Sequence, residues 1–389
     1  MKKYIIPFIL VVCGLLTTAM ANADETKILT PQDAIAKLGG PTLITMHLED
    51  ATPQQFYEAL WKQANLYPYG ERTAARRQTP LVSIDVEKQP FWNVVREFAH
   101  KTELGVEENL LEPRWYHLEP VARPSSPSGL LSASGPFLFE ISGINYKNTR
   151  EMAIKEATQQ LTVNTDFGLT VTVYADPKIS MVPDSADFHI DQVLTDNGKS
   201  LLENAPLKFR QRGSRFRASG PVKLSPQYDA NAKIASLKGI FTTQIVTQWQ
   251  TWEVPDLANA EGASHGAAPT ENTSGDGLYQ ITKVEPIKDG YQVELVFERP
   301  NPSMRMSDYV SMVSADMYAL DDKGKSLPIK FLGGRSQNIT GNDWRTTSRL
   351  QITRGEQNSK TGPIQLVWKY PVQFDTVKAP FEFKGLALP

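Results

Sequence analysis

The sequence predicts an α+β multidomain protein: an N-terminal duplicated strand–helix module of βαβαβ type, followed by two mainly antiparallel β-sandwich-like domains. Two internal repeats lead to this prediction. Residues 193–201 return as residues 318–327, and in both places a Pro-[Leu/Ile]-Lys-Phe segment follows. Residues 43–49 align with residues 81–87 without a gap, at an offset of 38. Duplication of a β-unit and of a strand–helix unit is the simplest cause of the two repeats.

The first residues have the pattern of an export signal. Lys2 and Lys3 precede an apolar stretch from Ile5 to Leu16, and the segment 21–23 (Ala-Asn-Ala) has the small-x-small form of a cleavage site. The apolar stretch is shorter than the roughly 20 residues of a membrane-spanning helix, so cleavage is favoured over anchoring. We therefore expect residues 1–23 to be a signal peptide, and the protein to be periplasmic, or secreted and associated with the cell surface.

Composition limits the classes of function. The chain has 41 Lys and Arg, 43 Asp and Glu, and one cysteine, Cys13, inside the predicted signal. The mature protein would have no disulfide and must fold on hydrophobic cores. A balanced, slightly acidic charge argues against a nucleic-acid partner bound through bulk charge. Since no second apolar run reaches membrane length, we expect no transmembrane segment after signal cleavage.

The first repeat predicts strands and helices in alternation. Apolar residues alternate with polar ones at 44–48 and again at 82–86, which is the period of a half-buried strand. Behind the first strand, Thr52 is a predicted N-cap, Pro53 opens the helix and Gln55 completes a capping box. A helix is therefore expected to cover one face of the sheet.

This pattern resembles the short N-terminal (STN-like) domain of secretins and TonB-dependent receptors, in which a strand, a segment such as 50–53, and an amphipathic helix leading to Leu66 recur twice. The resemblance covers residues 41–118 and places the module at 24–118. It implies a periplasmic protein–protein or signalling module. No barrel or pore segment follows, so the transport role of those families is not implied. The whole chain resembles exported bacterial proteins that combine such a module with tandem β-domains.

The rest of the chain is expected to be β-rich. Proline and serine mark residues 119–134 as a linker, and short strands punctuated by turn residues predict a first sandwich at 135–257. A helix-like segment, Glu151 to Gln160, interrupts it. Residues 258–277, rich in Ala, Gly, Asn and Ser, predict a flexible linker before a second sandwich at 278–389.

The Gly-Lys-Ser triplets at 198–200 and 324–326 invite comparison with a phosphate-binding loop. The glycine that such a loop needs five residues earlier is missing from both, and no helix follows. We expect residues 197–198 and 323–324 to form hairpin turns of type I′ instead.

No residue set predicts catalysis, a metal or a cofactor. The five histidines share no ligand spacing, and no nucleophile stands beside a base. Asp184, Asp187 and Asp191 could offer oxygens to calcium, but the glycine-punctuated loop of such sites is absent. A pair of carboxylates suited to sugar hydrolysis stays open, because folding can bring distant acidic residues together.

A run of alternating cations is the first candidate binding site. Lys208, Arg210 and Arg212 precede Gly213-Ser214, and Arg215 and Arg217 follow. In one hairpin all five cations would line one face and could bind a polyanion or an acidic partner. The alternative is an edge hairpin that its charge keeps unpaired.

Trp249 and Trp252 form the second candidate. Their odd spacing puts them on opposite faces of one strand, so one could stack on a sugar ring while the other packs in the core.

Together these patterns predict a non-catalytic exported binding or scaffold protein of the cell envelope, acting through protein–protein or polyanion contacts. The expected partner is an envelope protein or an anionic envelope polymer. The alternative is a carbohydrate-binding or carbohydrate-acting periplasmic or secreted protein.

Overall fold

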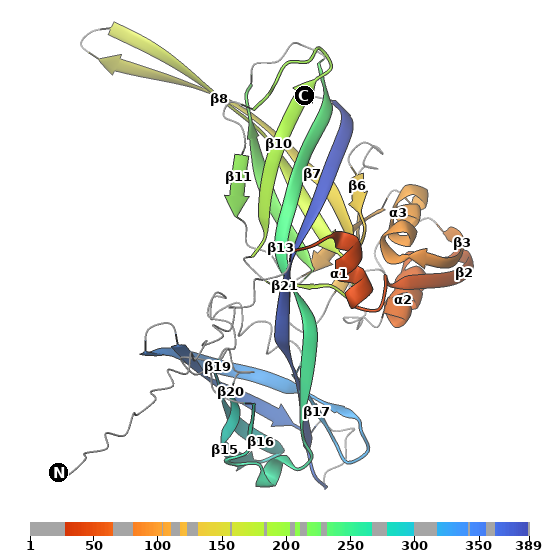
Figure 1. The fold of residues 1–389 in the computed structure, drawn as a ribbon, viewed down its shortest axis with the longest axis vertical. Coiled ribbons are helices and arrows are strands. Elements are labelled where there is room, and N and C mark those ends of the chain that lie inside the picture. The colour runs from red at the N-terminus through yellow and green to blue at the C-terminus, as the bar shows by residue number, and fades with distance from the viewer. Residues whose placement is uncertain are drawn as a thin grey trace, which may run out of the picture.

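The computed structural model describes residues 28–64, 81–102, 104–109, 117–122, 131–155, 158–182, 185–202, 207–210, 216–226, 232–266, 278–298, 317–340, 343–354 and 362–387. Within them the protein is mostly β-strand, arranged in several antiparallel sheets (Figure 1). The three α-helices are α1 (Pro31–Lys37), α2 (Pro53–Ala64) and α3 (Phe91–Thr102). The predicted signal peptide lies outside the described residues.

Two long strands run through both β-rich parts of the molecule (Figure 1). β13 (Lys233–Val254) pairs antiparallel with β21 (Gln365–Ala387), from Lys233 opposite Ala387 to Val254 opposite Leu366. The first half of β13 and the second half of β21 contribute to one hydrophobic core, and their other halves contribute to a second. The two expected sandwiches are therefore joined by continuous paired strands, and the boundary expected at 257/258 does not separate their sheets.

We call the core that contains the first half of β13 and the second half of β21 the upper core, and the other the lower core, after their places in Figure 1. The upper core lies between two sheets. One contains β13 and β21 with β10 (Asp187–Thr195) and β11 (Leu207–Arg210); the other has the order β12 (Arg217–Leu224), β8 (Thr158–Ala175), β7 (Phe137–Lys155) and β6 (Leu131–Ser134). Inward residues of both sheets meet in aromatic contacts. Phe139 of β7 stacks on Phe381 of β21 with ring centroids 4.8 Å apart.

The lower core also lies between two sheets. One is formed by the other halves of β13 and β21 and is extended by β17 (Met317–Leu320) and β18 (Ser326–Leu327); the second sheet has five strands. These five are, in order, β14 (Ser264–His265), β15 (Tyr279–Ile287), β16 (Gly290–Glu298), β20 (Asp343–Thr353) and β19 (Ile329–Thr340). Tyr279, Trp368 and Tyr370 are almost fully buried at its centre.

The strand pairing of the upper part recurs in the lower part. The ladder β6-β7-β8-β12 matches β14-β15-β16-β20, and β10 pairs with β13 as β17 pairs with β21. One strand differs. β11 pairs with β10, whereas β19, which follows the second copy of the repeat, pairs with β20 of the opposite sheet. The repeated sequence therefore occupies equivalent places up to its turn, after which the chain enters different sheets.

The two repeated turns have the same hydrogen bonds. Gly198 N–H donates to the carbonyl of Thr195 at 3.0 Å, and Gly324 N–H donates to that of Asp321 at 2.9 Å. Both glycines have positive φ, +80° for Gly198 and +74° for Gly324. The residues that precede the glycine in each turn do not have positive φ. The expected type I′ turn is therefore wrong, because it needs positive φ at both central residues. The pattern is a three-residue loop with a left-handed glycine, which forms a bulge.

Three expectations about local structure are corrected. The helix-like segment 151–160 belongs to the long β7–β8 hairpin, whose ladder overrides its helix propensity. The expected linker 258–277 is structured over its first part, since a 3₁₀ turn (Leu257–Asn259) and β14 occupy it and Ala260 is buried. β5 (His117–Ala122), paired with β4 (Leu104–Asn109), and β6 occupy the ends of the expected linker 119–134.

The elements of the N-terminal module follow in the order β2 (Leu43–Ala51), α2, β3 (Val82–Pro90) and α3. The next strand, β4, pairs with β5 and not with β2 or β3, so it does not complete the expected βαβαβ sheet. β2 and β3 pair antiparallel, and apolar residues of both strands face the helices. Phe56 of α2 stacks on Phe98 of α3 with centroids 4.0 Å apart. One face of the small sheet is covered by helices and the other is exposed.

Contacts in this module recur at the offset of 38. Asp50 and Lys88 both have positive φ, +45° and +48°, in the bulge of their strand. Asp50 N–H donates to Ser83 Oγ at 3.0 Å, and Lys88 N–H donates to Thr45 Oγ1, also at 3.0 Å. Each hydroxyl thus lies opposite the bulge of the other strand, so the sequence repeat has an exact counterpart in backbone geometry.

The module is fixed to the β-framework at its base. Leu138 and Tyr174 of β7 and β8 are part of the hydrophobic core of the module, and Trp92 of α3 lies 5.5 Å from the Tyr174 ring. The buried carboxylate of Asp176 accepts hydrogen bonds from Thr42 N–H at 3.1 Å and from Thr42 Oγ1 at 2.7 Å. These contacts hold the start of β2 against the end of β8.

A second connection joins the N-terminal segment to the long strands. β1 (Ile28–Leu29) pairs parallel with β21, and α1 follows it directly. Lys37 Nζ of α1 lies 2.5 Å from Oδ2 of the buried Asp375 in β21. Because a buried carboxylate without a partner is strongly destabilising, this ion pair ties α1 to β21.

We expect Gly239→Ala to weaken the upper part. A Cβ at this position of β13 would lie 2.5 Å from the carbonyl oxygen of His189 and 2.8 Å from Cζ of Phe381. The clash should lower the free energy of unfolding by about 1–3 kcal/mol, measured by urea denaturation. Ala235→Ser, at an exposed position of the same strand, is the control and should stay within about 0.5 kcal/mol. An unchanged urea midpoint for Gly239→Ala would contradict the close approach.

We expect Tyr57→Phe to leave the stability unchanged or to raise it. Tyr57 is buried in the module, and in the described part of the chain its hydroxyl has no hydrogen-bond partner, a situation that costs about 1–3 kcal/mol. Tyr57→Ala, which leaves a cavity, should cost about 3–5 kcal/mol. A clear loss of stability in Tyr57→Phe would show that the hydroxyl is satisfied.

The same side chain predicts a dependence on pH. Burial raises the pKa of Tyr57 above its ordinary value of about 10. The folded protein then keeps a proton that the unfolded chain releases, so stability is lost as pH rises above about 10. Urea denaturation at pH 8 and above pH 10 should show a smaller loss for Tyr57→Phe than for the wild type.

Candidate functional site

A groove of about 780 Å³ lies where β6 meets the sheet of β10, β13 and β21. These four strands form its walls. Glu382 lines it, with Lys238 Nζ at 3.4 Å and Lys384 Nζ at 3.5 Å from Oε1. The backbone N–H of Glu382 donates to Ser132 Oγ at 3.3 Å, which connects β21 to the edge strand β6.

The two lysines determine the charge of Glu382. Loss of hydration alone would raise its pKa, but the charges of Lys238 and Lys384 and their hydrogen bonds outweigh this and lower the pKa below its ordinary value. Glu382 is therefore ionised at neutral pH and does not supply a proton as a general acid would. The groove is lined by balanced charges and suits polar contacts better than acid–base chemistry.

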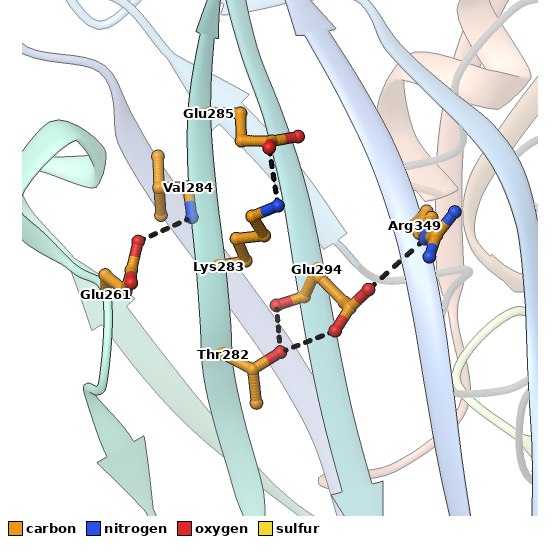
Figure 2. A network of polar contacts seen from close by, with 7 residues as sticks. All are labelled: Glu261, Thr282, Lys283, Val284, Glu285, Glu294 and Arg349. Atoms are coloured by element: carbon orange, nitrogen blue, oxygen red, sulfur yellow. Dashed lines mark hydrogen bonds and ion pairs between the residues drawn. The ribbon is translucent and has the colours of Figure 1, made fainter.

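A polar network lies on the outer face of the five-stranded sheet in the lower part (Figure 2). Thr282 Oγ1 donates to Glu294 Oε1 at 3.1 Å, and Arg349 Nε donates to Glu294 Oε2 at 3.2 Å. Lys283 Nζ lies 2.5 Å from Glu285 Oε1, and this hydrogen bond and charge raise the pKa of Lys283. Glu294 is thus paired with Arg349, and Glu285 is paired with Lys283.

The network has a structural role at a bulge. The register of β15 and β16 shifts between Ile281 and Lys283, where Thr282 also donates to the carbonyl of Glu294 at 3.3 Å. Val284 N–H donates to Glu261 Oε2 at 3.3 Å on the other side of β15. Exposed ion pairs of this kind stabilise only weakly, because water screens them. Together they hold the irregular strand in one register.

The predicted cationic hairpin is wrong in its geometry. Lys208 and Arg210 lie in β11, which pairs with β10, whereas Arg217 lies in β12, which pairs with β8 of the other sheet. The two strands that carry these cations therefore belong to different sheets. Arg212 and Arg215 lie outside the described residues.

The neighbours of the flanking cations indicate structural contacts. The backbone register places Arg210 opposite Asp187. The Cζ atom of Arg217 lies 5.9 Å from the ring centroid of Tyr174, which packs in the core of the N-terminal module. Arg217 therefore contributes to the junction between the module and the β-framework.

The two predicted sugar-stacking tryptophans differ in exposure. Trp252 is 8% exposed and stacks between Trp368 and His265, with centroids at 6.1 and 5.8 Å, so its faces are covered. Trp249 is half-buried and packs against the same core, and Lys369 Nζ lies 5.4 Å from its ring centroid. His265, expected in a flexible linker, is part of this aromatic cluster.

The described residues do not support the calcium hypothesis. Asp184 lies outside the described residues, and Asp191 Oδ1 lies 3.2 Å from His189 Nε2. Within the described ranges, no three His, Cys, Asp or Glu side chains are grouped so as to hold a metal ion. The helices of these ranges include none long and apolar enough to cross a membrane.

A further surface, which sequence patterns did not single out, lies in the N-terminal module. A groove of about 390 Å³ follows the outer edge of β3 beside α3, and we call it the β3-edge groove. Asp85, Glu87 and Glu97 line it above Val86 and Val94. Glu97 lies 2.8 Å from Lys101 Nζ, which also donates to the carbonyl of Ser83 at 2.8 Å. The groove combines backbone groups of a strand edge with an excess of negative charge.

Comparisons with known proteins leave the chain without a family assignment. It matches no protein-family model, and no curated protein matches it.

We expect the two tryptophans to differ in their contribution to stability. Trp252→Ala should lower the free energy of unfolding by about 3–5 kcal/mol, because it empties a packed aromatic core. Trp249→Ala should cost less, about 1–2 kcal/mol, because Trp249 is only half-buried against this core and also loses the contact with Lys369. Urea denaturation of both variants gives the comparison. Equal losses would contradict the expected effect of the difference in burial.

Proposed function

We propose that this protein is a non-catalytic binding or scaffold protein of the cell envelope that acts through protein–protein contacts. The observation that carries the proposal is the way the small module is held. Its core continues into β7 and β8, while the edge of β3 remains open to a partner. A rigidly mounted module with an open strand edge suits the presentation of a binding surface.

The recurrence of contacts at an offset of 38 supports the interpretation of this module as a duplicated strand–helix unit of STN-like type. Thr45 and Ser83 accept equivalent backbone hydrogen bonds, and α2 and α3 begin 38 residues apart. Modules of this type, by resemblance, mediate contacts between proteins in the periplasm. Export through residues 1–23 would bring the protein to that compartment.

The polar groups of the larger groove and of the lower sheet support binding over catalysis. Glu382, Glu285 and Glu294 are each engaged by lysine or arginine at 2.5–3.5 Å. The lysines beside Glu382 lower its pKa, whereas a general acid needs a pKa near the working pH. The carbohydrate alternative depends on exposed aromatic faces, and of the two tryptophans predicted for that role Trp252 is buried and Trp249 is half-buried.

The proposal predicts a specific protein partner in the envelope. The tagged full chain, expressed in its native cell and treated with a short cross-linker, should yield a discrete protein adduct in the envelope fraction. A chain lacking residues 1–23 is the matched control; it should remain in the cytosol and form no such adduct. Absence of any protein adduct, together with saturable binding of the mature chain on a glycan array, would overturn the proposal in favour of the carbohydrate alternative.

A further inference from the structure

The two edges of the small sheet in the N-terminal module are closed differently. At the edge of β2, Gln63 of α2 forms two hydrogen bonds to one residue: Thr45 N–H donates to Gln63 Oε1 at 2.8 Å, and Gln63 Nε2 donates to the carbonyl of Thr45 at 2.7 Å. The side-chain amide thus takes the place of a neighbouring strand. A further strand cannot pair at Thr45 without displacing it.

At the edge of β3 the equivalent position, 38 residues later, is Lys101 of α3. Its ammonium group donates to the carbonyl of Ser83 at 2.8 Å, but it carries no acceptor for the N–H of the same residue. Ser83 also has no register partner in β2, because the bulge at Asp50 lies opposite it. The edge of β3 is therefore closed on the acceptor side only.

Backbone alternation extends this open edge. From Ile84 to Val86 the register with β2 is regular, so the N–H and C=O of Asp85 point to the same edge as those of Ser83. The close contact of the Asp85 and His47 side chains, 2.6 Å, agrees with a pair that forms no backbone hydrogen bonds to each other. Among the described strands, none pairs with this edge. Ser83 and Asp85 thus offer backbone groups to an added strand.

Two other sheet edges in the described part of the chain, those of β12 and β19, carry features that obstruct pairing. β12 contains Pro221, which has no N–H to donate. β19 changes register near Gly333, whose φ is +126°. β3 has its bulge at Lys88, beyond the open positions, and has no proline before Pro90.

Charge identifies the occupant. Asp85 and Glu87 lie on β3 and Glu97 lies across the groove on α3, while Lys101 is the neighbouring cation. A strand carrying lysine or arginine would be attracted to these carboxylates. A second copy of this chain would place its own Asp85 and Glu87 against them, and like charges across a ladder are destabilising. Charge therefore favours a basic partner strand over self-pairing.

We propose that the β3-edge groove binds an extended, basic segment of a partner protein, which adds to the sheet as a third strand beside β3. The proposal rests on the proposed function and specifies its site. Backbone hydrogen bonds at Ser83 and Asp85 supply affinity, and contacts of the basic side chains with Asp85, Glu87 and Glu97 supply selectivity.

Lys101→Gln tests the proposal because two explanations predict opposite effects. A glutamine at this position should close the edge as Gln63 closes the edge of β2, so binding should weaken about tenfold. If the acidic groove only attracts cations, removal of a positive charge should strengthen binding. The probe is a fluorescent, acetylated and amidated peptide of alternating lysine and valine, seven residues long, titrated against the mature full chain by fluorescence anisotropy at physiological salt.

Two further measurements complete the test. The same peptide with N-methylated backbone on alternate residues keeps its charge but loses donors, and it should not bind. Bound unmodified peptide should slow hydrogen exchange in a fragment covering β3 and leave a fragment covering β2 unchanged.

Lys62→Gln is the matched control for Lys101→Gln. It lies on the exposed end of α2, removes the same charge away from the groove, and should bind the peptide as the wild type does.

Binding of the methylated peptide, stronger binding by Lys101→Gln, or no saturable binding of the probe would each overturn the proposal. Self-association of the wild type in sedimentation velocity that Lys101→Gln abolishes would identify a second copy as the occupant and would also overturn it. The cross-linking experiment separates the two levels. If the envelope adduct forms equally with Lys101→Gln, the binding function stands and this site fails.

Discussion

The pairing of β13 with β21 is the constraint on which the rest of the β-structure depends. Both strands are more than twenty residues long, and each half of the ladder supplies one wall of a different core. The remaining strands of each part complete a sheet or face it. A strand that belongs to two cores cannot move in one part without disturbing the other, so the upper and lower parts are mechanically coupled.

The N-terminal module uses the same framework as its base. α1 is tied to β21 by the ion pair of Lys37 and the buried Asp375, and β2 begins at the hydrogen bonds of Thr42 to Asp176. Both carboxylates are buried at the junction, where loss of a partner is costly. The module is thereby held in a defined orientation, which a flexible linker would not provide. A fixed orientation reduces the entropy lost when a partner binds to the module.

The candidate surfaces illustrate why residue lists from sequence need geometry. Alternating cations predicted one face of a hairpin, but the arms of that segment enter two sheets. The β3-edge groove was not singled out, although its signal is present in the repeat: the aligned positions 63 and 101 carry Gln and Lys. The contacts of Gln63 and Lys101 in the structure show the consequence of this difference: the edge of β2 is closed, and the edge of β3 is closed on the acceptor side only.

The sequence by itself determined the periodic and local features: the strands and helices of the first repeat, the places of the two glycine turns, and the alternation of buried residues in β13. These follow from side-chain periodicity and from the backbone freedom of glycine, which act within a few residues. Tertiary structure decided which strands pair, that two strands serve both cores, and that β11 and β19 enter opposite sheets. Such choices depend on packing between residues over a hundred positions apart, as for Phe139 and Phe381, and a local pattern carries no information about that partner.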